Sequence, residues 1–279
     1  MDKIAFIGAG NMARAIIIGL VNSGIEAKKI IVANPSAEKR QLLAHEFGVH
    51  QTDDNSEAAS FADVIILSVK PHFISDVCRQ ISQTITMTNK LFISVAAGRT
   101  VEQIQQALLN DEANHEGKTP KNIAVVRVMP NTPSQLGLGM SGLFASPEVN
   151  DTQKVMSEKI MTAVGKIIWL DSEAKINNII AVAGSAPAYF FLFMEAMEQK
   201  AKSLGFTDKE SRMLVEQTAL GAAQMVVQST DDISYLRDNV TSKGGTTFAA
   251  LEQFRSDGLA KIVDNAMSAA ITRAEAMAK

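Results

Sequence analysis

Two glycine-rich segments of the 279-residue sequence have residue types that can bind anions through the backbone. The first is Gly8-x-Gly10-x-x-Ala13, which follows an apolar strand pattern and opens an amphipathic helical pattern. Gly8 permits a tight turn, Gly10 lets a pyrophosphate approach the backbone, and Ala13 lets the helix pack close to the strand. The helix N-terminus also faces the negative charge. A tight strand–helix turn without a ligand is the alternative, but both flanking elements favour a dinucleotide site.

The end of the next strand pattern bears on which dinucleotide binds. NAD-binding versions of the loop carry an acid about 20 residues further on, which hydrogen-bonds the ribose 2′-hydroxyl. Here the strand ends in Ala33-Asn34-Pro35-Ser36, with no acid at its tip. Ser36, Lys39 and Arg40 could supply a hydroxyl and positive charge for a 2′-phosphate, although the two basic residues could also form a solvated helix face. The sequence therefore predicts NADP(H), with NADH as a weaker alternative.

Three further strand ends carry groups that could line the same crevice, because ligands of open α/β sheets bind beyond the carboxyl ends of the strands. They are "SVKP" (Ser68–Pro71), "AAG" (Ala96–Gly98) and "MPNTP" (Met129–Pro133). Lys70 could lie near the nicotinamide and favour an anionic or imine-bearing substrate, or it could be an exposed lysine at a strand end. The two prolines of the third segment predict a stiff turn that lines the pocket.

The second glycine-rich segment is "VTSKGGTT" (Val240–Thr247), which precedes a helix expected to begin near Phe248. Its glycines could let the backbone N–H groups of Gly244–Thr247 point at one anion, which the helix dipole favours. Thr246 and Thr247 could cap the helix, or one hydroxyl could face a ligand. A glycine-rich turn with a threonine cap is the alternative on spacing alone.

In the first half of the chain, alternating apolar strands and amphipathic helices position the first glycine loop and the strand ends. Continuous apolar strands rich in Val and Ile, separated by helices, predict a parallel sheet covered on both faces. The expected strands lie at Lys3–Gly8, Lys29–Asn34, Val64–Val69, Leu91–Ala96, Ile123–Met129, Gly139–Ser146 and Lys166–Asp171, and Asn110–Asn122 is expected to be a polar loop.

Strand patterns stop after Asp171, and apolar residues such as Leu259, Ile262 and Val263 then recur at helical spacing. The predicted fold class is α/β, with an N-terminal Rossmann-type doubly wound sheet and an all-helical C-terminal domain. We expect the NADP-binding domain to span residues 1–164 and the helical domain to span residues 165–279.

The overall composition excludes several classes of function. A net charge of −3 gives no general reason to bind nucleic acid or an acidic membrane. The single cysteine, Cys78, and an N-terminus that runs straight into a strand pattern predict a cytoplasmic protein. No metal is expected, because the histidines lack metal-ligand spacing and no HExxH or CxxC motif occurs. His72 could be a general acid, but an exposed loop histidine is the simpler interpretation.

One apolar run, Ile179–Met194, has no charged residue and could be taken for a membrane span. It is 16 residues long, short of the roughly 20 that a spanning helix needs. Gly184, Ser185 and Pro187 interrupt it, so we expect a helix buried in a core or a subunit interface.

Longer motifs make the chain similar to a known family. The stretches "IGAGNMARAI", "ANPS", "SVKP", "VAAG", "VRVMPNTP", "AGSAPAYFFLFMEA" and "LRDNVTSKGGTTFAALEQF" closely resemble the pyrroline-5-carboxylate reductase family, nearly from end to end. The family usually has Gly where this chain has Ala186, and Pro in place of Lys243.

The resemblance implies an activity and an assembly. It implies that NADPH reduces the cyclic imine (S)-1-pyrroline-5-carboxylate to L-proline, and that the helical domain interlocks with a second subunit. A homodimer would be the unit and a larger homo-oligomer would form from it. In family terms the "GGTT" loop binds the substrate carboxylate through backbone N–H groups, and the Thr247 hydroxyl reaches the ring nitrogen.

The residues expected at the site fall into three groups. The catalytic candidates are Thr247, Lys70 and Glu195, of which Glu195 could instead be a helix-surface carboxylate. The expected substrate contacts are Met129, Gly244, Gly245, Thr246 and Thr247. The expected cofactor contacts are Gly8, Gly10, Asn11, Met12, Asn34, Ser36, Lys39, Val69, Lys70, Pro71, Ala96, Ala97, Gly98 and Asn131.

Two other functions compete with this one. A β-hydroxyacid dehydrogenase shares the two-domain plan, but it would carry a lysine in the second domain where this chain has "AVAGSAPAYFF". A non-catalytic NADP-binding sensor would keep Gly8 and Gly10 but would have no use for "VTSKGGTT".

Overall fold

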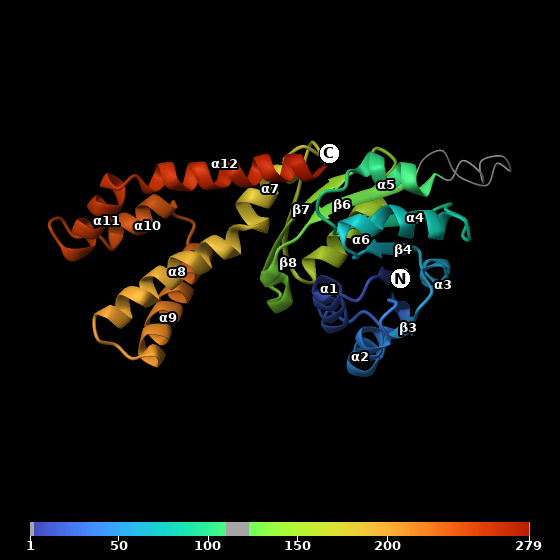
Figure 1. Cartoon of the computed structure of the whole chain (residues 1–279), viewed down its shortest axis with the longest axis horizontal. Helices are drawn as coiled ribbons and strands as arrows, with labels where there is room; N and C mark the ends of the chain where they lie inside the picture. The colour runs from blue at the N-terminus through green and yellow to red at the C-terminus, as the bar shows by residue number, and fades with distance from the viewer. Residues whose placement is uncertain (1–2, 110–122, 279) are drawn as a thin grey trace. The chain divides into compact units, whose positions relative to one another are not determined.

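The computed structural model describes residues 3–109 and 123–278 (Figure 1). The predicted polar loop at Asn110–Asn122 lies outside these residues. The described chain forms two compact units. The first contains the residues up to Ser185 together with those from Ala270 onward, and the second is Ala186–Ala269.

The first unit is built on a sheet of eight strands in the order β3-β2-β1-β4-β5-β6-β7-β8. Every neighbouring pair is parallel except β6 and β7. The predicted doubly wound sheet is confirmed, and its strand order reverses beside β1. The strands are β1 (Ile4–Ile7), β2 (Ile30–Ala33), β3 (His50–Thr52), β4 (Val64–Leu67), β5 (Leu91–Ser94), β6 (Ala124–Met129), β7 (Gly139–Ala145) and β8 (Gly165–Trp169).

Two features of the sheet differ from the expectation. Strand β3 was not predicted, because its sequence His-Gln-Thr is polar and two of its three residues are exposed at the sheet edge. The predicted domain boundary after residue 164 also differs from the division of the units. Strand β8 pairs in parallel with β7 and so belongs to the sheet.

Helices cover both faces of the sheet, which is why its central strands are apolar on both sides (Figure 1). One buried cluster joins the sheet to α1 (Asn11–Asn22), α2 (Ala37–Phe47) and α6 (Asp151–Thr162). The other joins it to α3 (Asn55–Phe61), α4 (Ile74–Ser82) and α5 (Val101–Leu108). Short 3-10 turns lie at η1 (Ala27–Lys29), η2 (Pro71–Phe73) and η4 (Thr132–Leu136).

A helical stretch of uneven geometry leads out of the sheet. It comprises α7 (Lys175–Ile179), a π-helical turn η5 (Ile180–Gly184) and α8 (Ala186–Ser203). The N–H of Ser185 donates to the carbonyl of Ile180 at 2.7 Å, which is the wider hydrogen bond of a π-turn. By length and composition the stretch Lys175–Ser203 could cross a membrane, with a mean hydropathy of 1.6 in its most apolar window. Core helices of soluble proteins pass the same test.

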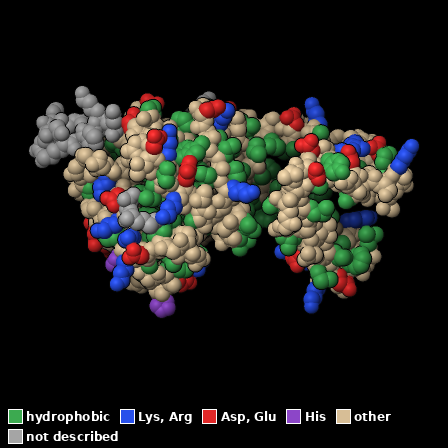
Figure 2. Space-filling view, turned by 180° about the vertical axis from the view of Figure 1, so that it is seen from behind, with side chains coloured by type: hydrophobic (Ala, Val, Ile, Leu, Met, Phe, Trp, Pro, Cys, Tyr) green, Lys and Arg blue, Asp and Glu red, His purple; other side chains and the backbone are tan. Residues whose placement is uncertain are grey.

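The second unit is helical, as predicted. It contains α8, α9 (Asp208–Gln228), α10 (Ile233–Asn239), α11 (Thr246–Ser256) and the larger part of α12 (Leu259–Ala278). Many of its large apolar side chains are exposed in the single chain; those of Phe190, Phe191 and Leu192 are 64%, 63% and 67% exposed. Apolar side chains reach the surface visibly in the space-filling view (Figure 2).

The single cysteine is a core residue. Cys78 on α4 is fully buried, and burial raises the pKa of its thiol to about 12. The thiol is therefore protonated at neutral pH, which excludes it as a nucleophile.

Gly165 at the start of β8 should be the glycine most sensitive to substitution. A Cβ at this position would lie 2.0 Å from the carbonyl oxygen of Gly139, and φ is +150°. We expect Gly165→Ala to reduce the free energy of unfolding by more than about 3 kcal/mol. Gly24→Ala is the matched control, because Gly24 has φ +89° but open space around its Cβ position; it should cost only about 1–2 kcal/mol. Urea denaturation measures both, and equal losses would contradict the steric account.

Candidate active site

The predicted dinucleotide loop connects β1 to α1. Gly8 has φ +110°, and a Cβ there would lie 2.7 Å from the carbonyl oxygen of Ser68. Gly10 is the N-cap of α1, no side chain caps this helix, and nothing lies within 4 Å of a Cβ placed on Gly10. The turn therefore demands glycine at the first position for steric reasons, while the second leaves room beside an uncapped helix N-terminus. Asn11 and Met12 form the first turn of α1.

The end of β2 is tied to this loop by hydrogen bonds. The Ala9 N–H donates to Oδ1 of Asn34 at 3.3 Å. The Arg40 guanidinium donates to the carbonyls of Asn34 and Pro35 at 3.0 and 3.1 Å, so it supports the turn from behind. Ser36 is exposed, and so is Lys39. Of the two basic candidates for a 2′-phosphate, Arg40 is therefore hydrogen-bonded to the turn, and Lys39 is not.

The end of β4 lies beside β1 and the end of β5 lies beside β4, and hydrogen bonds also join their loops. The Ser68 hydroxyl lies 3.0 Å from the carbonyl oxygens of both Ile7 and Gly8. Arg99, which follows the Ala96–Gly98 segment, donates from Nε to the carbonyl of Pro71 at 3.1 Å. Sequence reasoning missed Arg99, because its partner lies 28 positions away along the chain. Val69 and Ala97 are half-buried, Ala96 is buried, and Lys70 is exposed.

The two predicted site residues at the end of β6, Met129 and Asn131, differ in burial and in contacts. Asn131 is buried, donating from Nδ2 to the carbonyl of Ala183 at 3.1 Å and accepting from the N–H of Met140 at 2.9 Å. Its amide thus joins the π-helical turn to β7, and a contact with the cofactor stays a prediction. Met129 is half-buried and packs against Gly184, where an added Cβ would lie 2.8 Å from its terminal methyl carbon.

The "GGTT" segment corrects one expectation. Helix α11 begins at Thr246, not near Phe248, and Gly245 is its N-cap without a side-chain hydrogen bond. The alternative of a threonine cap is therefore wrong: Thr246 and Thr247 are exposed residues of the first helical turn. The N–H of Gly245 donates to the carbonyl oxygen of Ser242 at 2.9 Å, so it is already hydrogen-bonded within the turn. The donors left for an anion are those of the first turn, which have no intrahelical partner.

The predicted residues divide between the two units. All the cofactor candidates and Met129 belong to the first unit, whereas Gly244–Thr247 and Glu195 belong to the second. Glu195 is an exposed residue of α8. The cofactor candidates thus follow the carboxyl ends of parallel strands of one sheet, and among them Asn131 has its side-chain amide engaged within the protein.

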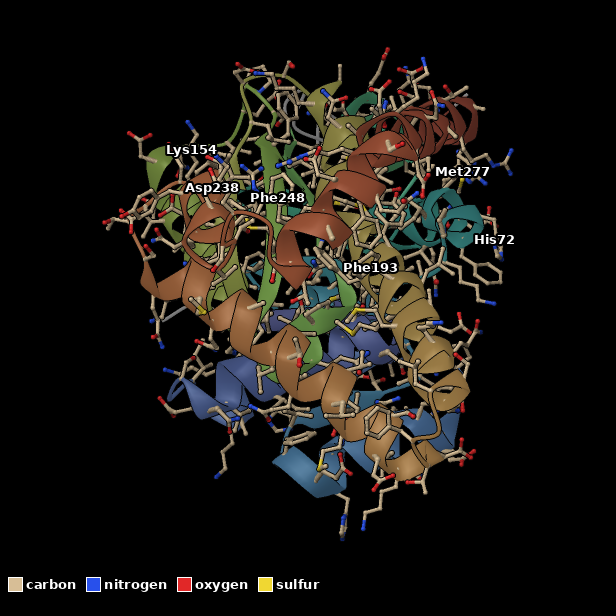
Figure 3. All side chains as sticks on the ribbon, turned by 90° about the vertical axis from the view of Figure 1, so that its left-hand side faces the viewer. His72, Lys154, Phe193, Asp238, Phe248 and Met277 are labelled. Carbon is tan, nitrogen blue, oxygen red and sulfur yellow. The ribbon has the colours of Figure 1, made fainter. Side chains whose placement is uncertain are left out.

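Residues 3–109 and 123–278 contain no group of three or more His, Cys, Asp or Glu side chains that could hold a metal ion. His72 is exposed (Figure 3), and its ring lies against that of Phe73 with centroids 4.1 Å apart and planes tilted by 51°. This position is that of a surface histidine.

Comparison with known proteins gives the family. One family model, described as pyrroline-5-carboxylate reductase dimerisation, matches residues 173–277. Another, described as NADP oxidoreductase, coenzyme F420-dependent, matches residues 3–98. The pyrroline-5-carboxylate reductase of Vibrio alginolyticus is 52% identical over 278 residues, which cover 99% of this chain and 98% of the relative. The chain belongs to the pyrroline-5-carboxylate reductase family.

Solved structures of the family share the fold. The pyrroline-5-carboxylate reductase of Coxiella burnetii is 42% identical with a TM-score of 0.92, and the match covers 100% of this chain and 99% of that one. The Plasmodium falciparum pyrroline carboxylate reductase, solved with NADP bound, is 28% identical with a TM-score of 0.83. The match covers 100% of this chain and 98% of that one. The resemblance seen in the sequence motifs is thereby confirmed.

The two loop glycines should respond differently to alanine. In Gly10→Ala the new methyl meets no protein atom, so we expect an unchanged melting temperature but NADPH binding weakened at least about tenfold, because the methyl fills the space predicted for the pyrophosphate. Gly8→Ala should lower the melting temperature as well, since its Cβ meets the Ser68 backbone. Thermal unfolding and NADPH fluorescence titration measure both. Unchanged NADPH affinity in Gly10→Ala would contradict the predicted pyrophosphate position.

Proposed function

We propose that this protein is a pyrroline-5-carboxylate reductase. It reduces the imine of (S)-1-pyrroline-5-carboxylate to L-proline, the last step of proline biosynthesis. The observation that carries the proposal is the 52% identity to a reductase of that name over 99% of the chain. We propose the cytoplasm as its location, in keeping with a single cysteine that is buried and unpaired.

The residues of the first unit fit NADPH. The space beside Gly10 and the uncapped N-terminus of α1 suit a pyrophosphate, because unpaired N–H groups and the helix dipole both favour negative charge. Asn34 stands where NAD-specific loops carry an acid, and the exposed Ser36 and Lys39 suit a 2′-phosphate. When bound, NADPH supplies the hydride. Lys70, at the end of β4, would attract an anionic substrate to the crevice.

The residues of the second unit fit the substrate's carboxylate and ring nitrogen. In our proposal the N–H groups at the first turn of α11 bind the carboxylate, supported by the helix dipole. The Thr247 hydroxyl hydrogen-bonds the ring nitrogen; because it is a poor acid, it orients the imine rather than donating the proton. Glu195 would stabilise positive charge on a protonated imine. Alignment of the two reactants is the larger contribution, since it can supply about 7–11 kcal/mol.

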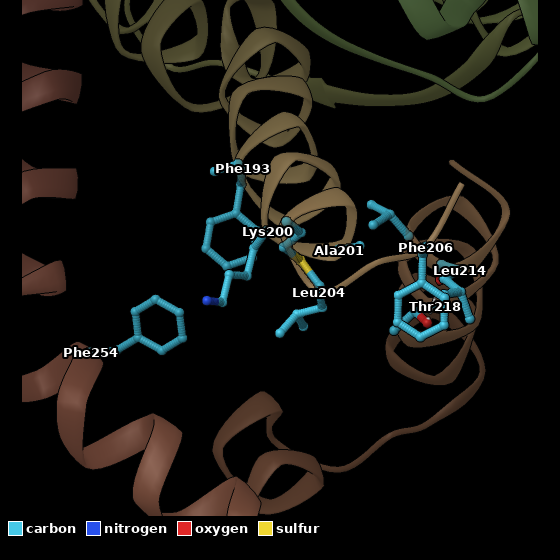
Figure 4. A pocket seen from close by; sticks show the side chains of 11 residues that line it. Phe193, Lys200, Ala201, Leu204, Phe206, Leu214, Thr218 and Phe254 are labelled. Atoms are coloured by element: carbon cyan, nitrogen blue, oxygen red, sulfur yellow. Dashed lines mark hydrogen bonds between the residues drawn. The ribbon is translucent and has the colours of Figure 1, made fainter. Parts of the chain in front are cut away.

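We further propose a homodimer as the unit, which assembles into a larger homo-oligomer. In the single chain the helical unit leaves a mostly apolar hollow of about 450 Å³ (Figure 4). It is lined by Phe193, Ala196, Met197, Lys200, Ala201, Leu204, Phe206, Leu214, Val215, Thr218 and Phe254. A second chain that covers this surface would remove it from water, and the matched dimerisation model spans the same helices.

The first test is the initial rate of NADPH oxidation with pyrroline-5-carboxylate, with NADH in parallel. We expect turnover with kcat/KM at least about fivefold higher for NADPH, a difference of about 1 kcal/mol. Lys39→Gln should narrow this preference, whereas Lys28→Gln, an exposed lysine of η1, should leave it unchanged. A preference for NADH would overturn the cofactor assignment. Tight NADPH binding without turnover would instead indicate a non-catalytic sensor.

A pair of threonine variants tests the role of α11. Thr247→Ala should lower kcat about 10- to 100-fold with an unchanged KM for NADPH, because the hydroxyl that orients the imine is lost. Thr246→Ala is the matched control: it changes the neighbouring exposed threonine of the same helical turn and keeps every backbone donor. Steady-state kinetics decide between them, and equal effects of the two substitutions would count against Thr247.

A further inference from the structure

A partly buried ion pair in the first unit joins the buried Arg127 to Glu173, whose side chain is 25% exposed. Arg127 is in β6, and its side chain is only 4% exposed. Its Nη1 lies 2.9 Å from Oε1 of Glu173, in the segment between β8 and α7. The two residues are 46 positions apart in the sequence. Without the Glu173 carboxylate, the Arg127 guanidinium would be an uncompensated buried charge.

The same carboxylate also holds a helix end. Oε1 of Glu173 accepts the N–H of Val101 at 2.8 Å, and Val101 is the first residue of α5. The adjacent Thr100 caps α5 by a reciprocal hydrogen-bonded box with Gln103. One carboxylate oxygen therefore joins β6, the start of α5 and the segment that leads to α7.

Two of the three elements that the pair joins, α5 and β6, adjoin a proposed contact of the reaction. The Ala96–Gly98 segment, a proposed cofactor contact, ends two residues before α5. Met129, a proposed substrate contact, is two positions after Arg127 on β6, so both side chains lie on one face of the sheet. A shift of Arg127 or Glu173 would thus move both contacts at once.

The ion pair leaves some buried polar atoms without a hydrogen bond. Nη2 of Arg127 is buried without a hydrogen-bond partner among the described residues, and so is Oγ of Ser94. Ser94 is the register neighbour of Arg127 on β5. Arg127 is thus a buried cation with an unsatisfied donor, which is weak evidence that the pair exists for stability alone and motivates a positional role for it.

We propose that Arg127 and Glu173 are positioning residues for the reduction. Their ion pair fixes the Ala96–Gly98 segment and the Met129 end of β6 relative to one another. This inference rests on the proposed function, because it takes those two segments as the cofactor and substrate contacts.

Four variants of the full-length protein test the pair. Arg127→Met removes the charge and keeps much of the side-chain length, Arg127→Lys keeps a single charge contact, and Glu173→Gln keeps an acceptor for the Val101 N–H. Lys175→Gln is the matched control, since it breaks an exposed ion pair with Asp171 in the same segment. The readouts are kcat, both KM values and NADPH affinity, measured well below each variant's melting temperature.

A positioning role predicts a specific pattern of kinetics. Arg127→Met should lower kcat/KM for the imine at least about tenfold and weaken NADPH binding, because small misplacements of reacting groups are costly. Arg127→Lys should recover most of this loss, and Lys175→Gln should match the wild type. If Arg127→Met changes the melting temperature but leaves kcat and both KM values within about twofold of the wild type, the pair is structural only and the proposal is overturned.

Two further outcomes are separable. If Arg127→Met does not fold, Glu173→Gln decides: a raised KM for NADPH supports the proposal, and an unchanged one overturns it. If the wild type itself turns over no imine, the proposed function fails, but NADPH titration still tests the pair. Weakened binding in Arg127→Met relative to Lys175→Gln then supports the hold on Ala96–Gly98, and equal binding overturns it.

Discussion

The close approach of the backbone at Gly8 to the backbone at Ser68 is the constraint around which the first unit is arranged. No side chain fits between them, since a Cβ on Gly8 would lie 2.7 Å from the Ser68 carbonyl oxygen. The Ser68 hydroxyl closes the same gap by bonding the carbonyls of Ile7 and Gly8. This contact joins β1 to β4 where the strand order reverses, which is where open α/β sheets bind ligands.

Long-range hydrogen bonds between neighbouring loops then give this edge of the sheet a fixed shape. Asn34 links the end of β2 to the glycine loop, and Arg99 links the β5 loop to Pro71. Loops at a sheet edge would otherwise be the least restrained part of the unit. Asn34 is also an expected cofactor contact, whereas Arg99 is not among the residues proposed to touch ligands, so a search for chemically reactive groups alone passes over Arg99.

The second unit differs from the first in how much apolar surface it exposes. Its helices leave large apolar side chains such as Phe190 and Leu192 exposed in the single chain, and the stretch Lys175–Ser203 even passes a membrane-span test of length and composition. Contiguous apolar surface of this kind marks an interaction site. The match of residues 173–277 to a dimerisation model offers a protein partner as the physical explanation.

The sequence by itself determined the doubly wound sheet, the glycine turn and the helical second half, because each has a local signature of periodicity or residue type. It did not determine strand β3, whose three polar residues carry no apolar alternation, or the start of α11 at Thr246, which depends on Gly245 acting as N-cap. Only the tertiary structure revealed the inward-facing amide of Asn131 and the bond from Arg127 to Glu173. Those contacts join residues 52 and 46 positions apart, and periodicity in one segment holds no information about its partner in another.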